Sequence, residues 1–116
     1  MTSVRLLVLA GRFVGFNAEG HTGYAPAGED IVCAGVSTLL QTTVLGLEKL
    51  VGLDLQIRQE KKSGFLSCLI PVHADEDQRQ QADFLFNFMY LGLQQIALEY
   101  PKYVQISLKE VEKDEV

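Results

Sequence analysis

With 116 residues, of which 47% are hydrophobic and 22% charged, the chain has enough apolar material for one compact domain and no room for a second. The formal net charge of −5 argues against direct binding to nucleic acid, which normally requires a basic face, and suits a basic partner instead. No segment approaches the ~20 apolar residues of a membrane span, and no signal peptide is evident, so we expect a cytoplasmic protein that does not contact a membrane.

The first half of the chain predicts two strands followed by a helix. Residues 4–9 and 12–18 have the alternating pattern of strands and are joined at Gly11. A helix is expected over about residues 31–51, with Gly52 as its stop. Its inward face is expected to consist of the apolar or small residues that recur at helical spacing, which are Val32, Val36, Leu39, Thr43, Leu47 and Leu50.

The second half repeats this order and adds a last strand. Residues 53–59 and 65–72 are predicted strands around a charged turn, and residues 103–108 form the last one. Between them a long helix is expected over about residues 76–99, capped by Asp75 and stopped by Pro101. The order ββαββαβ, with mostly antiparallel pairing and two helices packed on the sheet, predicts a single α+β domain.

The apolar residues of this long helix divide into two stripes. One stripe comprises Ala82, Leu85, Met89, Leu93 and Ile96, and the other comprises Phe84, Phe88, Leu91 and Leu98. A sheet covers only one stripe of a helix, so the second is expected to lie in an interface. The pattern therefore predicts a homodimer.

The stretch GHTGYAPAGEDIVCAGVS, residues 20–37, combines a histidine in a glycine-rich loop with a cysteine at the start of a helix. Asp30 or Glu29 is the expected N-cap, which puts Cys33 in the first turn. Unpaired N–H groups and the helix dipole favour a thiolate there, and His21 could share the thiol proton if the loop folds back. On residue types alone, a buried small cysteine and a turn histidine are the commoner outcome.

Other polar residues carry weaker signals. Ser37 shares a helix face with Cys33, where it either supports the site by hydrogen bonding or binds a carbonyl one turn back. Cys68 is interpreted as a buried strand residue rather than a disulfide partner, and His73 has no obvious partner. Because no His, Cys and carboxylate set has metal-ligand spacing, we expect neither a metal nor a cofactor.

The motif in residues 20–37 also carries a family resemblance. It resembles the signature of the ribosomal-processing cysteine proteases of bacteria, the Prp family, at Gly20, His21, Gly23, Tyr24, Gly28, residues 30–34 and residues 36–37. The similarity extends over the whole chain and implies that residues 1–116 form one cysteine protease domain, with His21 and Cys33 as the catalytic pair. It implies a substrate as well, namely a large-subunit ribosomal protein whose N-terminal extension carries bulky apolar or aromatic residues near the cut. The resemblance also points to a homodimer.

The resulting hypothesis is a cysteine endopeptidase. Cys33 would attack a peptide carbonyl, His21 would accept and return the proton, and the Cys33 N–H would help to stabilise the oxyanion. Gly20, Asp30 and Ser37 are expected to support the site, Asp30 either by orienting His21 or only as the N-cap. The loop glycines fit a lid over the substrate or an ordinary turn-rich connection. Two alternatives are a non-enzymatic ribosome-associated binding module, in which Cys33 is inert, and a thiol redox sensor.

Overall fold

The structure, a computed structural model, describes residues 1–21, 23–26 and 30–113. Its five strands form a single sheet in the order β3-β4-β2-β1-β5, antiparallel throughout except for the parallel pair β1 and β5. The predicted α+β class and element order are confirmed. The elements are β1 (Thr2–Leu9), β2 (Arg12–Glu19), α1 (Ile31–Lys49), β3 (Gln56–Glu60), β4 (Phe65–Leu69), α2 (Glu76–Glu99) and β5 (Val104–Glu110).

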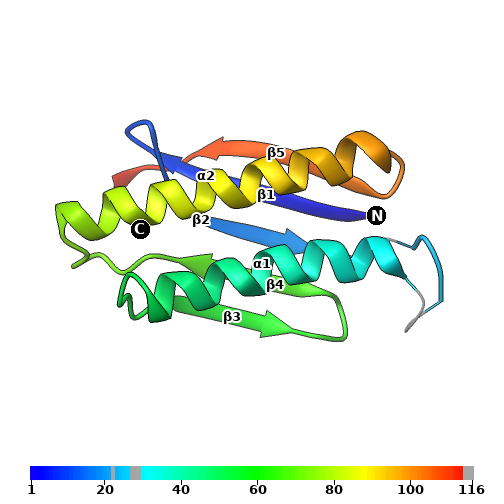
Figure 1. Ribbon diagram of the computed structural model, residues 1–116, viewed down its shortest axis with the longest axis horizontal. Helices are drawn as coiled ribbons and strands as arrows, with labels where there is room; N and C mark the ends of the chain where they lie inside the picture. The colour runs from blue at the N-terminus through cyan, green and yellow to red at the C-terminus, as the bar shows by residue number, and fades with distance from the viewer. Residues whose placement is uncertain (22, 27–29, 114–116) are drawn as a thin grey trace.

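Both helices lie side by side on one face of the sheet (Figure 1). The core fills the space between these two layers, and its largest fully buried side chains come from both of them. Phe16 of β2 meets Phe86 of α2 edge to face, with ring centroids 6.4 Å apart. This edge-to-face geometry is the one that aromatic pairs prefer, and it fixes α2 over the middle of the sheet.

Helix α1 differs from its predicted form at its C-terminal end. It ends at Lys49, and Gly52 takes the positive φ of +78° that the following turn requires. The prediction that Leu50 faces inward is wrong, because this side chain is 79% exposed. Leu39, also predicted to face inward, is only partly buried. The other four predicted residues, Val32, Val36, Thr43 and Leu47, are buried as expected, and Leu40 and Val44 complete the buried face.

The second predicted hairpin is shorter than expected. Strand β3 begins at Gln56 rather than at residue 53, because Leu53 instead donates its backbone N–H to Leu47 O at 3.1 Å and is buried beneath the end of α1. Helix α2 has the predicted bounds, since Asp75 and Gln78 form a reciprocal capping box at its start.

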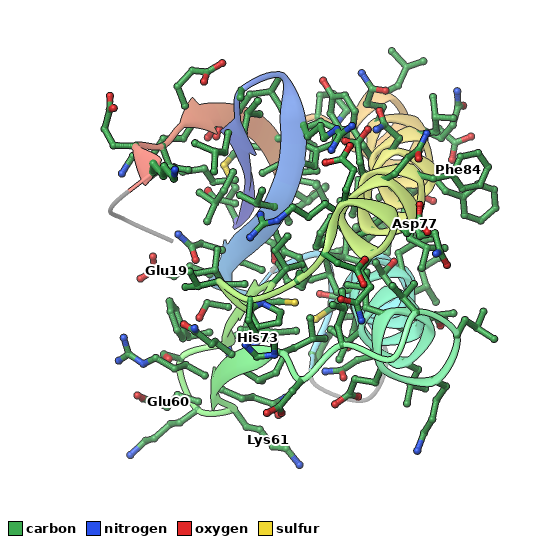
Figure 2. The ribbon with its side chains drawn as sticks, turned by 90° about the vertical axis from the view of Figure 1, so that its left-hand side faces the viewer. Glu19, Glu60, Lys61, His73, Asp77 and Phe84 are labelled. Carbon is green, nitrogen blue, oxygen red and sulfur yellow. The ribbon has the colours of Figure 1, made fainter. Side chains whose placement is uncertain are left out.

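The two stripes of α2 have opposite environments. Ala82, Met89 and Leu93 are buried as predicted, together with Phe86, which the stripes did not include. The second stripe is exposed: Phe84 by 73%, Phe88 by 70%, Leu91 by 62% and Leu98 by 76%. Figure 2 shows Phe84 pointing away from the body of the domain. The prediction that one sheet covers only one stripe is confirmed for the described chain.

Contrary to the expectation from the sequence, one helix among the described residues, α1, is long and apolar enough to cross a membrane. Its buried face packs on the sheet, with Val36 and Leu47 at most 3% exposed. The core helix of a soluble domain satisfies the same length and composition, so this feature is weak evidence for a membrane segment.

Candidate active site

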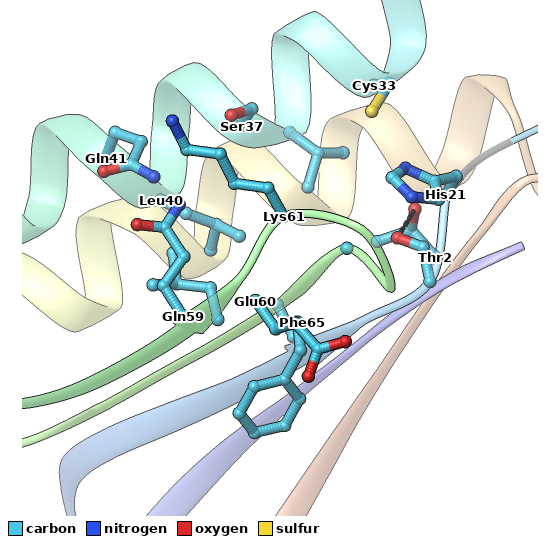
Figure 3. A pocket seen from close by; sticks show the side chains of 15 residues that line it. Thr2, His21, Cys33, Ser37, Leu40, Gln41, Gln59, Glu60, Lys61 and Phe65 are labelled. Atoms are coloured by element: carbon cyan, nitrogen blue, oxygen red, sulfur yellow. Dashed lines mark hydrogen bonds between the residues drawn. The ribbon is translucent and has the colours of Figure 1, made fainter. Parts of the chain in front are cut away.

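His21 and Cys33 line the same cleft at one end of the domain (Figure 3). His21 directly follows β2 and Gly20, and Cys33 lies in the first turn of α1, where it is partly buried. The loop between them returns the chain from the sheet to the helix, so the two side chains reach the cleft from different layers. The structure therefore brings together the two residues of the predicted pair.

Asp30, one of the two residues predicted as the cap, is the N-cap of α1. The other candidate, Glu29, lies outside the described residues. The Asp30 carboxylate accepts the backbone N–H of Cys33 at 2.8 Å and that of Tyr24 at 3.2 Å. The expectation that the Cys33 N–H faces an oxyanion is thus wrong in this structure, because the cap already engages that donor. Whether Asp30 also orients His21 stays a prediction.

The described part of the loop is anchored by Tyr24. Its ring packs edge to face on Tyr100 and Tyr103, with centroid distances of 5.5 and 5.3 Å. Both partners lie at the connection between α2 and β5. Tyr24 therefore holds this part of the loop against the α2–β5 connection, which lies at the same end of the domain as the start of α1 (Figure 1). Gly28 lies outside the described residues, and the proposed lid motion stays a prediction.

The position of His21 depends on close backbone packing around Gly20. Gly20 has φ of +89°, and a Cβ atom there would lie 2.4 Å from Met1 O, so only glycine fits without a shift. The Gly20 carbonyl accepts the Thr2 hydroxyl at 3.2 Å. Beyond it, Nε2 of His21 lies 3.1 Å from the carbonyl oxygen of Lys62 in the β3–β4 turn. This contact joins residues far apart in the sequence, and no sequence signal indicated it.

The cleft contains a cavity of about 180 Å³ between α1 and the β3–β4 hairpin. This volume corresponds to roughly six water molecules, about the size of one bulky side chain. Its apolar lining comes from Ala18, Val36, Leu40, Phe65 and Leu66, and its polar lining includes Gln41, Gln59, Glu60 and Lys61. Of these residues, only Val36 belongs to the motif of residues 20–37. The side chains of the β3–β4 hairpin are far from that motif in the sequence and reach the site through the fold.

A second hollow meets the first at the same residues. It is lined by Gly23, Ala25, Asp30 and Ala34, and it shares His21, Cys33 and Ser37 with the first cavity. The predicted supporting residue Ser37 thus lies where the two hollows join. Among the described residues its hydroxyl makes no hydrogen bond, either within the site or to a carbonyl one turn back. A chain running from one hollow to the other would pass Cys33.

His73 lies outside this site. It is exposed in the segment between β4 and α2 (Figure 2), and it is not among the residues that line either hollow. Within the described ranges, no group of three or more His, Cys, Asp or Glu side chains is placed to hold a metal ion.

Cys68 is the buried strand residue that the sequence predicted. It is 1% exposed on β4, and both cysteines are free thiols. Burial raises the pKa of the Cys68 thiol to about 12, with a further increase from the nearby charge of Glu48. Cys68 therefore stays protonated at neutral pH and is a poor nucleophile, whereas Cys33 opens onto the cleft.

Iodoacetamide is expected to alkylate one thiol of the native protein at pH 8 and two after unfolding. The native adduct should be on Cys33, because the Cys68 thiol stays protonated until the pH approaches about 12 and is 1% exposed. Peptide mass mapping assigns the site. Equal modification of both cysteines in the folded protein would contradict this prediction.

Comparison with known proteins agrees with a cysteine protease. A family model described as "Cysteine protease Prp" matches residues 1–105. Fold and family together define the class of protein: a cysteine protease. More particularly, the chain belongs to the Prp family.

Individual relatives lie at moderate sequence distance. The ribosomal processing cysteine protease Prp of Bacillus subtilis (strain 168) is 27% identical over 92 residues, which are 79% of this chain and 82% of the relative. The crystal structure of the ribosomal processing protease Prp from S. aureus, with a covalently linked product peptide, has a TM-score of 0.83 at 25% identity; the match covers 94% of this chain and all of that one. Another S. aureus structure, with a substrate peptide, shares the fold with a TM-score of 0.78 at 24% identity, over 94% of this chain and 100% of that chain.

Proposed function

We propose that this cysteine protease removes the N-terminal extension of a large-subunit ribosomal protein, with Cys33 as nucleophile and His21 as general base and acid. The observation that carries the proposal is that His21 and Cys33, from separate layers of the fold, line one cleft with a hollow on each side. The names of the B. subtilis and S. aureus relatives support the ribosomal substrate.

The chemistry follows from the two side chains. His21 accepts the thiol proton, and Sγ of Cys33 adds to the carbonyl carbon of the scissile bond. When the tetrahedral intermediate collapses, the C–N bond breaks and His21 returns the proton to the departing amine. Water then adds to the thioester with His21 again as base, and breaking the S–C bond frees the new carboxylate. The covalently linked product peptide of the S. aureus protein supports a covalent intermediate of this kind.

The cavity beside Cys33 supports an apolar or aromatic side chain next to the cut bond. Leu40, Phe65 and Leu66 make its lining mainly apolar, and its volume of about 180 Å³ matches one large side chain. The net charge of −5 suits a basic ribosomal protein as the wider partner, chiefly by favouring encounter.

The experiment that tests this function is incubation with a full-length ribosomal protein that carries such an extension, followed by mass measurement of both products. Cleavage at one bond, with an apolar or aromatic residue beside it, supports the proposal. An intact substrate that still binds would favour the non-enzymatic alternative, and rapid reversible oxidation of Cys33 without cleavage would favour a redox sensor.

We propose further that the protein is a homodimer that uses the exposed stripe of α2. The four side chains Phe84, Phe88, Leu91 and Leu98 are spaced along one helix face and are each more than 60% exposed. Between residues 80 and 98 the only charged residue is Asp83, which accepts the backbone N–H of Phe13. A second acidic copy is therefore not repelled at this face, and a two-fold axis would pair the stripe with itself.

Replacing Phe88 with Glu is expected to shift the protein from dimer to monomer, because the change places two charges in a desolvated apolar contact. Sedimentation at micromolar concentration should give twice the chain mass of 12.9 kDa for the parent and a lower mass for the variant. Val72→Glu is the matched control, since Val72 is 65% exposed but lies off the stripe. A parent protein that sediments as a monomer, or equal effects of both substitutions, would contradict the α2 interface.

A further inference from the structure

We infer that the backbone carbonyl of Lys62 is the positioning group of His21, and that Gly64 permits the contact between them. The inference rests on the proposed catalytic role of His21. It gives the pair a third member that is not a carboxylate and that comes from the β3–β4 turn, 41 residues along the chain from His21.

The chemistry of the contact defines which ring nitrogen carries the proton. Nε2 of His21 lies 3.1 Å from the Lys62 carbonyl oxygen, and a carbonyl oxygen only accepts hydrogen bonds. Nε2 must therefore be the N–H donor, which in the neutral ring leaves the lone pair on Nδ1. Nδ1 is then the nitrogen that accepts the proton of Cys33. A carbonyl acceptor orients the ring in this way without adding a negative charge to the cleft.

The β3–β4 turn forms hydrogen bonds with two neighbouring residues of the segment that carries His21. Besides the Lys62 contact, the Gly20 N–H donates to Ser63 O at 3.3 Å. The turn is closed by Gly64, whose N–H donates to Lys61 O at 3.2 Å. Two neighbouring residues of the β2 end are thus bound by two successive carbonyls of one turn. This pattern fixes the backbone at Gly20 and the ring of His21.

Gly64 makes this close approach possible. A Cβ atom at this position would lie 2.6 Å from Gly20 O and 3.1 Å from Cε1 of His21. The first of these neighbours is backbone, so the turn and the His21 segment would have to move apart. Gly64 also has φ of +68°, which disfavours other residues whatever the space. Separating these two effects requires a matched control.

The test compares Gly64→Ala and Gly64→Asn with Gly52→Ala in the full-length protein. Asparagine tolerates a positive φ better than alanine but brings the same Cβ, so both Gly64 variants should push His21 away. Gly52 has φ of +78° with nothing within 4 Å, so its alanine variant carries the backbone strain alone. Three readouts apply: the ¹⁵N NMR signals of the His21 ring, the cleavage rate, and the pH profile of Cys33 alkylation.

We expect the parent to show His21 protonated at Nε2, and both Gly64 variants to show a mixture of tautomers. Cleavage should fall roughly 10²-fold in these variants, the size of a small misplacement of a reacting group, and the alkylation profile should shift. Gly52→Ala should match the parent in all three measurements. A parent ring protonated at Nδ1, or Gly64 variants with the parent's tautomer and rates, would overturn the inference. If no protein cleaves the substrate but the tautomer change occurs, the positioning contact stands and the proposed function fails.

Discussion

Replacing Cys33 with Ala is expected to abolish peptide cleavage and to leave the fold intact. Loss of the nucleophile of a serine protease lowers kcat by roughly a million-fold, and a loss of similar size is expected here. The fold should survive because the Cys33 side chain is only partly buried and alanine is the best helix former. The Asp30 cap binds the backbone N–H of residue 33, which alanine retains. Cys33→Ser should be nearly as inactive, since a hydroxyl is a far weaker nucleophile without a stronger base.

Cys68→Ala is the matched control for this experiment. It removes the other thiol, which is 1% exposed on β4, so it should lower the free energy of unfolding by about 1 kcal/mol and keep cleavage. Circular dichroism and thermal unfolding report the fold, and product mass reports cleavage. Retained turnover in purified Cys33→Ala protein would falsify the assignment of the nucleophile.

The parts of the fold that local signals define were predictable from the sequence. Helix α2 has its predicted bounds because the Asp75–Gln78 capping box starts it and Pro101 follows its end. The start of α1 at Ile31 was also predicted, with Asp30 or Glu29 as its cap. The end of α1 was not, because Leu50 continues the apolar pattern although the helix has already ended at Lys49. There tertiary packing of Leu53 beneath the helix overrides the local pattern.

The candidate site also has a part that local sequence signals predict and a part that only the tertiary fold assembles. Cys33 and its cap belong to one local motif, so residue types and spacing placed Cys33 in the first turn and narrowed the cap to Asp30 or Glu29. The Lys62 carbonyl and the apolar lining from Phe65 and Leu66 reach the cleft only through the pairing of β4 with β2. A backbone carbonyl has no signature in sequence, because every residue carries one. The engagement of the Cys33 N–H by Asp30 was likewise implied by the cap, although the predicted oxyanion role overlooked it.

Replacing His21 with Ala is expected to slow both peptide cleavage and alkylation of Cys33. Loss of a general base typically lowers the rate by about 10²- to 10⁴-fold, and the thiolate also loses the group that stabilises it. The pH at which alkylation reaches half its maximal rate should therefore rise in the variant. Because His21 is an exposed side chain at the edge of the cleft, its removal should leave a space that added imidazole can enter. Imidazole should then restore part of the cleavage rate.

His73→Ala is the control for this substitution. His73 is the other histidine of the chain and is also exposed, but it lies outside the cleft, so its variant should match the parent in both rates. A purely structural role of His21 would lower the melting temperature and the cleavage rate together, without a shift in the alkylation profile and without rescue by imidazole. If the parent and His21→Ala proteins have the same alkylation profile, His21 does not partner Cys33. In that case the base must come from another group that lines the cleft.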